Sequence, residues 1–344
     1  MTFLGVVEGF YGRPWHPGTR LQMLGWLAEL GIDAYLYAPK ADPWLRRRWR
    51  DVWPPSEQEL LTDLASEGRA ADIEVGVGLS PYALYREYNA KAREDLHARV
   101  KTLIDCGVSS IALLYDDMPG DMDALAERQA EIAYDVYTWI GAVTLRLCPT
   151  YYSDDPTLDE FFGRRPENYL VDLVQQLPHN CVPFWTGPEV CSTVIPGTHL
   201  EQLAHRLGRP VALWDNYPVN DSRSRSPHLY LGALQHRAPA NTSVLESHWC
   251  NAMNQAALSL PAVASLAQLY GRDQGASDGV FAAAGLTPDL IRACLPLAAC
   301  ALEDLSGEQR HELSRLAEAS TPAARELSEW LAGEYVFDPA CLTD

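Results

Sequence analysis

The chain has 344 residues, of which 47% are hydrophobic, so it is long enough to bury a large core. Its 46 acidic and 27 basic side chains give a formal net charge of -19, which repels phosphate backbones and anionic membrane surfaces. We therefore expect neither nucleic acid nor a membrane surface to be a partner.

Short apolar runs alternate with segments of helical periodicity over the first 270 residues. Strands are predicted at 3–7, 34–37, 75–79, 111–115, 144–148, 182–185, 211–214 and 243–249. Helices are predicted at 21–30, 56–69, 92–106, 124–140, 168–176, 200–207 and 254–270, the second opened by a capping box of Ser56 and Glu59. This alternation predicts an α/β protein with a (β/α)8 TIM barrel over residues 1–270. An open doubly wound sheet is the alternative, disfavoured because no Gly-x-Gly-x-x-Gly turn follows an early strand.

A basic run, Arg46-Arg47-Arg48-Trp49-Arg50, is the exception to the acidic composition. Its interleaved Trp49 would suit a nucleic-acid contact. Overall charge favours instead a solvated loop after a strand, with the tryptophan ring folded back onto the barrel.

The predicted strand at 111–115 is followed directly by Asp116 and Asp117, then by Pro119 and Gly120. Barrels place their chemistry at the carboxyl ends of the strands. Adjacent strand residues point to opposite faces, so both carboxylates share a pocket only if the backbone leaves regular geometry between them. In that case one carboxyl should keep its proton near neutral pH while the other stays ionised. The alternative is that one Asp caps the next helix and the other is solvated.

Residues 271–344 are rich in Ala, Leu and Glu and predict a small helical C-terminal region, with helices near 288–305, 308–318 and 322–333. The eight cysteines form no Cys-x-x-Cys and no zinc-like cluster, so we expect buried thiols, no metal and no cofactor. With neither a secretion signal nor a long apolar span in the sequence given, we expect a cytoplasmic protein. Oligomeric state is left open.

Polar and aromatic side chains recur where the predicted strands end, and together they suit a neutral, hydroxyl-rich ligand such as a sugar. Singly, Lys40 and Asp221 could be surface charges, Trp214 a core residue and Asn251 a helix cap. The set comprises Gly9, Lys40, Asp116, Asp117, Tyr152, Trp214, Asn216, Asp221 and Asn251.

The motifs around these positions resemble glycoside hydrolase family 84, which contains the O-GlcNAcases and related β-N-acetylglucosaminidases. They are GVVEGFYGRPW (5–15), YAPK (37–40), the pair at 116–117, CPT (148–150), WTGP (185–188), WDN (214–216), ND (220–221) and NAMNQ (251–255). The resemblance implies a retaining hydrolysis in which the substrate's acetamido oxygen attacks the anomeric carbon, giving an oxazoline intermediate.

The same resemblance implies roles for single residues. Asp116 would accept the acetamido N–H, and Asp117 would act as general acid and then as general base. Tyr152 would support the acetamide oxygen, Trp214 would wall the pocket of the acetyl methyl, and Asn216 would bind near the acetamide. The sugar hydroxyls would be bound by Gly9, Lys40, Asp221 and Asn251.

One motif departs from the family, because Asn251-Ala252-Met253 stands where Asn-Pro-Met is usual. Loss of the proline loosens the backbone at Asn251. The implied substrate is a GlcNAc-bearing glycoprotein or glycan.

Two other functions stay open. A conventional two-carboxylate glycosidase would pair Asp117 with Glu8 or Asp215 and would accept sugars without the acetamido group. A non-catalytic sugar-binding scaffold would have no need of the costly like-charge pair at Asp116 and Asp117.

Overall fold

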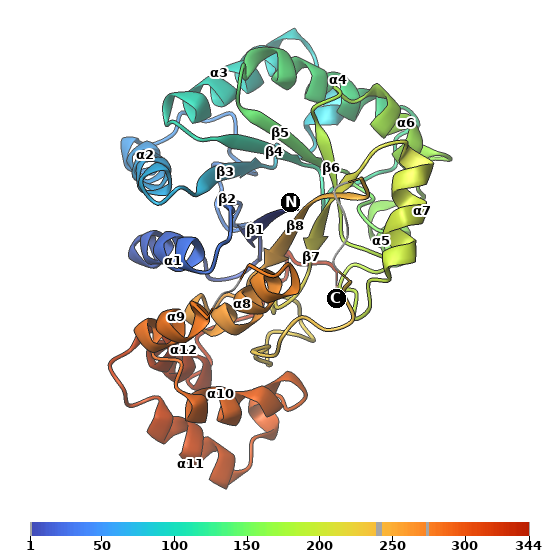
Figure 1. Cartoon of the computed structure of the whole chain (residues 1–344). Coiled ribbons are helices and arrows are strands. Elements are labelled where there is room, and N and C mark those ends of the chain that lie inside the picture. Colours follow the sequence, from blue (N-terminus) through green and yellow to red (C-terminus); the bar gives the residue numbers. More distant parts are fainter. Residues whose placement is uncertain (1, 239–242, 273–274, 344) are drawn as a thin grey trace.

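Eight parallel strands close into a barrel in the computed structural model, which describes residues 2–238, 243–272 and 275–343 (Figure 1). Each strand pairs with the next along the chain, and β8 pairs with β1 to close the ring. The strands are β1 (Phe3–Glu8), β2 (Ala34–Tyr37), β3 (Glu74–Leu79), β4 (Ser110–Leu114), β5 (Thr144–Cys148), β6 (Val182–Trp185), β7 (Val211–Asp215) and β8 (Leu245–Asn251). The predicted barrel is confirmed, and closure rules out the open sheet.

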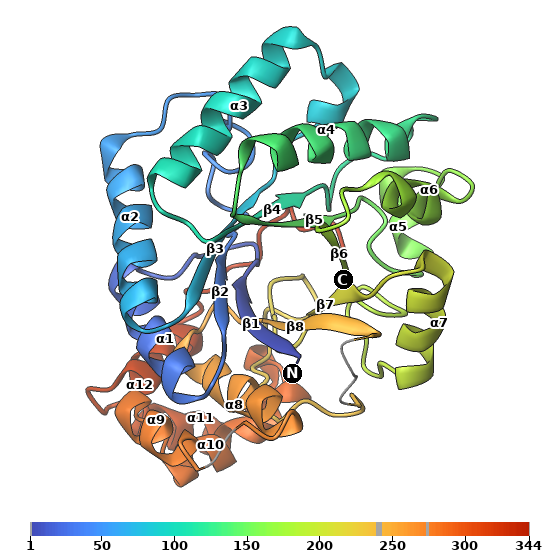
Figure 2. The same cartoon turned by 45° about the horizontal axis from the view of Figure 1, so that its top comes forward.

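Helices follow the strands and surround the barrel (Figure 2). They are α1 (Pro17–Glu29), α2 (Pro55–Ala70), α3 (Ala90–Asp105), α4 (Leu125–Trp139), α5 (Thr157–Phe162), α6 (Tyr169–Gln176), α7 (Gly197–Leu207) and α8 (Leu260–Leu269), with 3-10 turns at η1 (Leu84–Glu87) and η2 (Ala257–Ser259). Strands buried on both faces explain the continuous apolar runs in the sequence.

Several local features differ from the predictions. The capping box at Ser56 is absent, because α2 begins at Pro55 and no side chain caps its first turn. Proline suits the first helical position, where its missing N–H costs nothing. Strand β8 begins and ends two residues later than predicted, and the short helix α5 was not foreseen.

The barrel interior is filled by large side chains with close backbone neighbours. Trp249 on β8 is fully buried, and a Cβ on Gly5 of β1 would lie 2.1 Å from its ring. Only glycine fits there. The guanidinium of Arg146 on β5 lies 4.8 Å from the centre of the Trp249 ring and 3.0 Å from Glu74. These side chains fill the barrel below the carboxyl ends of its strands.

The C-terminal helical region lies on one side of the barrel, next to α1 and α8 (Figures 1 and 2). It contains α9 (Ser277–Ala284), α10 (Pro288–Cys294), η3 (Leu295–Ala298), η4 (Leu302–Asp304), α11 (Gly307–Leu316) and α12 (Pro322–Leu331). No disulfide joins any of the eight cysteines, all of which are described. Among the described helices, no single one has the length and apolarity to cross a membrane, although the bent pair at 277–284 and 288–298 passes that test together.

Candidate active site

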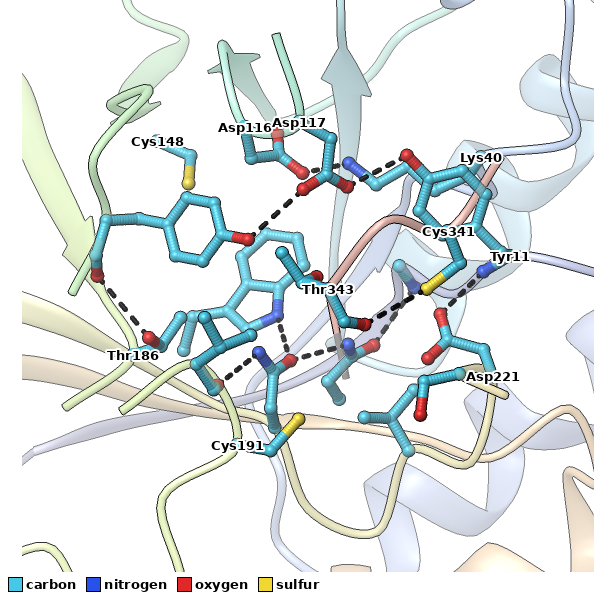
Figure 3. Close-up of a pocket in the computed structure, with 18 residues that line it drawn as sticks. Tyr11, Lys40, Asp116, Asp117, Cys148, Thr186, Cys191, Asp221, Cys341 and Thr343 are labelled. Carbon is cyan, nitrogen blue, oxygen red and sulfur yellow. Dashed lines mark hydrogen bonds and ion pairs between the residues drawn. The ribbon is translucent and has the colours of Figure 1, made fainter. Parts of the chain in front are cut away.

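A pocket opens at the carboxyl ends of the barrel strands, and every predicted site residue lines it (Figure 3). The predicted residues come from the ends of six strands and from the loops after them, because a closed parallel barrel brings all its strand ends to one rim. Those lining it as predicted are Gly9, Lys40, Asp116, Asp117, Tyr152, Trp214, Asn216, Asp221 and Asn251.

The two adjacent aspartates share the pocket because the backbone turns between them. Strand β4 ends at Leu114, and Asp117 has a φ of 55°, in the left-handed region that few non-glycine residues adopt. The guanidinium of Arg46 donates a hydrogen bond to the backbone oxygen of Asp117 at 3.0 Å, which holds this turn. The predicted departure from strand geometry is confirmed.

Asp116 is buried and forms an ion pair with Lys40 through its Oδ2 atom. Its Oδ1 atom is also buried and has no hydrogen-bond partner among the described residues. A buried carboxylate oxygen without a donor carries a desolvation cost, so this atom is ready to accept an N–H from a ligand.

Two phenol hydroxyls bind the carboxyl group of Asp117. Tyr11 donates to Oδ2 at 2.8 Å, and Tyr152 donates to Oδ1 at 3.1 Å. Burial and the nearby charge of Asp116 raise the pKa of Asp117, while Lys40, Arg46 and the Tyr11 hydrogen bond oppose that rise. A raised pKa lets the Asp117 carboxyl keep its proton to higher pH, as a general acid requires.

A wall of the pocket is held by hydrogen bonds among its own members. Asn216 Oδ1 accepts from the indole of Trp214 at 3.0 Å and from Asn251 Nδ2 at 2.9 Å. Asn251 Oδ1 accepts from the backbone N–H of Gly9 at 3.2 Å, and a Cβ on Gly9 would lie 2.5 Å from the Trp214 ring. Asn251 is thus fixed without the family's usual proline. The wall combines an apolar indole face with amide groups.

Asp221 also lines the pocket. Its carboxylate accepts the backbone N–H of Tyr11 at 2.7 Å. Burial raises the pKa of Asp221 to about 6, against the lowering effect of that hydrogen bond. A third carboxyl group therefore lines the pocket, besides those of Asp116 and Asp117.

Neither Glu8 nor Asp215 lines the pocket, so neither is available as the second carboxylate of a conventional glycosidase. Glu8 is fully buried, with its two oxygens 2.8 Å from the guanidinium of Arg20. Asp215 is paired with Arg237 at 2.7 Å. Both groups are held in structural ion pairs, and that alternative is wrong in its choice of residues.

Several pocket residues were not predicted: Tyr11, Cys148, Thr186, Val190, Cys191, Val219, Ser222, Cys341 and Thr343. Tyr11, Cys148 and Thr186 stand in the motifs GVVEGFYGRPW, CPT and WTGP, so their positions at or after the ends of β1, β5 and β6 were available signals. Cys341 and Thr343 carried no such signal, because they lie far along the chain from every strand end.

The basic run at 46–50 does not form a solvated loop throughout. Arg46 is buried and donates to Ser80 at 2.7 Å as well as to Asp117. Trp49 is buried against the barrel, as predicted. Arg47 stacks on Tyr82, with 3.6 Å from the guanidinium to the ring centre. The run therefore supports the site turn and packs on aromatic rings.

The pocket thus combines one ion-paired carboxylate, one carboxyl bound by phenols, amide groups and an indole face. This set suits proton transfer on a neutral, polar ligand with an apolar group. Among the described residues no group of His, Cys, Asp or Glu has the arrangement of a metal site.

Comparisons with known proteins agree on one family. Residues 4–280 match the family model described as beta-N-acetylglucosaminidase. The chain is 32% identical over 246 residues to the proteins named Protein O-GlcNAcase of Rattus norvegicus and of Mus musculus, an alignment that covers 68% of this chain and 26% of each relative. The chain therefore matches only about a quarter of the length of these curated relatives.

Solved structures of similar fold include an O-GlcNAc hydrolase. A mutant of the Thermobaculum terrenum O-GlcNAc hydrolase has a TM-score of 0.77 and 27% identity, and the match covers 97% of this chain and 81% of that one. CpGH84B has a TM-score of 0.75 at 20% identity, covering 96% of this chain and 66% of that one, which shows a shared fold.

Proposed function

Because the chain belongs to the beta-N-acetylglucosaminidase family, we propose that it hydrolyses terminal β-linked N-acetylglucosamine with retention, using the substrate's own acetamido group as nucleophile. The observation that carries this proposal is the pair of adjacent aspartates in unlike surroundings. Asp116 is ion-paired to Lys40, with one oxygen lacking a donor, and Asp117 is bound by two phenols.

In the first step the acetamido oxygen bonds to the anomeric carbon while the bond to the leaving oxygen breaks. Asp117 gives its proton to that oxygen. Asp116 accepts the acetamido N–H on its unpartnered oxygen, and its charge favours the developing oxazolinium in a buried site. The products of this step are the free aglycone and an N-protonated oxazoline, whose N–H stays hydrogen-bonded to Asp116 until the ring is opened.

In the second step a water molecule bonds to the anomeric carbon and opens the oxazoline. Asp117, now ionised, takes the proton from that water. Two inversions at one carbon give net retention. Neither step needs a second enzyme carboxylate within bonding distance of the sugar, which fits the commitment of Glu8 and Asp215 to ion pairs.

The other pocket residues bind the sugar in this proposal. Trp214 supplies the wall for the acetyl methyl, and Asn216 fixes that wall through its hydrogen bonds to Trp214 and Asn251. Tyr152, which donates to Asp117, turns to support the acetamide oxygen when substrate enters. Hydroxyl groups are bound by Lys40, Asp221, Asn251 and the backbone of Gly9.

The proposed substrate class is a GlcNAc-bearing glycoprotein or glycan, since the curated relatives are named for O-GlcNAc removal. The proposed compartment is the cytoplasm, because a protein with eight cysteines and no disulfide suits a reducing environment.

The test uses two chromogenic substrates, p-nitrophenyl N-acetyl-β-glucosaminide and p-nitrophenyl β-glucoside. We expect turnover of the first alone, with the β-anomer of N-acetylglucosamine appearing first by NMR. Turnover of both would support a conventional two-carboxylate mechanism, and turnover of neither, with N-acetylglucosamine still bound, would support a sugar-binding scaffold. Either result would overturn the proposal.

A further inference from the structure

The segment that follows α12 returns from the helical region to the mouth of the barrel (Figure 1). It begins at Tyr335, whose hydroxyl donates to Glu329 at 2.8 Å and whose ring lies 5.3 Å from the Arg13 guanidinium. Phe337 lies under Arg223, which follows the pocket residues Asp221 and Ser222, with 5.3 Å from guanidinium to ring centre. Residues 335–337 thus contact Arg13 and Arg223 near the carboxyl ends of the barrel strands.

The end of this segment enters the pocket. The backbone N–H of Cys341 donates to Asp338 at 2.9 Å, which closes a turn, and Cys341 and Thr343 are both 9% exposed. Both line the same pocket as Asp117 and Trp214, and Figure 3 draws them among those side chains. Burial raises the pKa of Tyr152, and a side-chain hydrogen bond with Thr343 opposes that rise. Thr343 therefore contacts a residue of the proposed acetamide site.

The space left beside the segment is too small for a sugar. The free cavity measures about 50 Å³, whereas pockets that bind small molecules enclose roughly 300–1,000 Å³. A cavity of this size holds one or a few water molecules. Cys341 and Thr343 take up part of this space, so an N-acetylglucosamine unit gains room when residues 341–343 move away.

The segment is held loosely enough to move. Val336 is 73% exposed and Leu342 46% exposed, so these two apolar side chains bury little area. The ion pair between Arg13 and Glu334 is half exposed on both sides and contributes little to stability. No strand or helix includes residues 336–343 in the described structure. Release of the segment therefore leaves the barrel and α12 intact.

We propose that residues 336–343 form an intramolecular plug, which occupies the sugar pocket and which substrate must displace. This inference rests on the proposed function, because it takes the pocket to be the sugar site. If a ligand binds only molecules whose plug is displaced, its apparent Kd equals the Kd of the open form divided by the fraction of molecules that are open. The plug therefore raises KM and the Kd of sugar ligands by one common factor and leaves kcat unchanged.

The first test is a chain that stops after Tyr335, compared with the full chain. We expect the Kd for N-acetylglucosamine, measured by calorimetry, and the KM for the chromogenic substrate to fall together by roughly 5- to 30-fold, with kcat unchanged. The matched control is Val336→Ser, a change at an exposed position of the same segment, which should alter neither constant. Thermal unfolding checks that the shortened chain is folded. Unchanged or weaker binding by the folded short chain would overturn the plug.

The second test needs neither turnover nor a variant. In the full chain, N-acetylglucosamine should speed the alkylation of Cys341 by iodoacetamide, followed by mass spectrometry, because the sugar displaces the plug. Cys300, in the helical region, is the control and should react at one rate with and without sugar. If the sugar binds and Cys341 reacts no faster, the plug is wrong while the proposed function stands. If the sugar binds neither the full nor the shortened chain, both fall.

Discussion

Two sets of buried carboxylates lie at the ends of barrel strands, and they differ in how their charge is balanced. Glu8 and Asp215, on β1 and β7, each face an arginine in a close ion pair. Asp116 and Asp117, after β4, share one ion-paired lysine and two phenols, and one carboxylate oxygen has no described partner. The fully paired set stabilises the fold, whereas the incompletely paired set is available to a substrate.

The pKa values of Asp215 and Asp117 differ in the same way as their ion pairing. Burial alone would raise the pKa of Asp215, but hydrogen bonds from Arg237 and His248 outweigh it and hold that pKa below 3.8. For Asp117, burial and Asp116 prevail and the pKa is raised. The two pKa values thus shift in opposite directions, because Asp215 receives hydrogen bonds from Arg237 and His248 whereas Asp117 lies beside the negative charge of Asp116.

The largest expected effect is that of Asp117→Asn, which removes the proton donor. For substrates with alkyl leaving groups, kcat should fall about 10²- to 10⁴-fold, since general acid catalysis contributes that much. Substrates with acidic phenol leaving groups should lose much less, because such groups leave without a proton. Kinetics across a series of aryl and alkyl glycosides measures this. An equal loss for all leaving groups would assign the acid elsewhere.

Arg237→Ala tests the paired set. Removing the cation leaves Asp215 buried and charged, which should lower the free energy of unfolding by about 3–5 kcal/mol, measured by urea denaturation. The stability that Asp215 contributes is present above its unfolded pKa and lost as pH falls below it, so the variant and the parent should converge in acid. The control is Arg93→Ala, which breaks a more exposed ion pair with Asp135 and should lower the free energy of unfolding far less.

In Asp116→Asn the nucleophile is kept but its orienting charge is lost. We expect kcat to fall about 10²- to 10³-fold, the loss found when one preorganised electrostatic contact is removed. Steady-state kinetics with the N-acetyl substrate measures it. A total loss, with a sugar ester trapped on Asp116 of the parent enzyme, would instead make Asp116 a nucleophile.

Tyr11→Phe should give the smallest effect, on the pH profile. The Tyr11 hydrogen bond opposes the rise in the pKa of Asp117, so its removal raises that pKa further. Asp117 must be protonated for the first step, and activity falls as pH rises through its pKa. The basic limb of kcat/KM should therefore move to higher pH. Tyr134→Phe, at an exposed position on α4, is the control and should leave the limb unchanged.

Much of the barrel was predictable because its signals are local. The strands at 34–37, 144–148 and 182–185 were predicted with their observed bounds, since each is a short run with turn residues nearby. Site residues after the strands were also predictable, because closure of the barrel gathers the strand ends. Contacts between distant segments were not predictable. Arg46 reaches Asp117 across 71 positions, and the plug reaches the pocket from beyond α12.

The mechanism is tested most directly with substrates whose acetyl methyl carries none, one, two or three fluorines. Fluorine withdraws electrons and makes the acetamido oxygen a poorer nucleophile. If that oxygen attacks the anomeric carbon, kcat/KM should fall steeply with each added fluorine. Inhibitors that carry the same fluoroacetamido groups measure how fluorine changes binding alone, and this effect is subtracted. A rate that stays flat across the series would show that the acetamido oxygen is not the nucleophile.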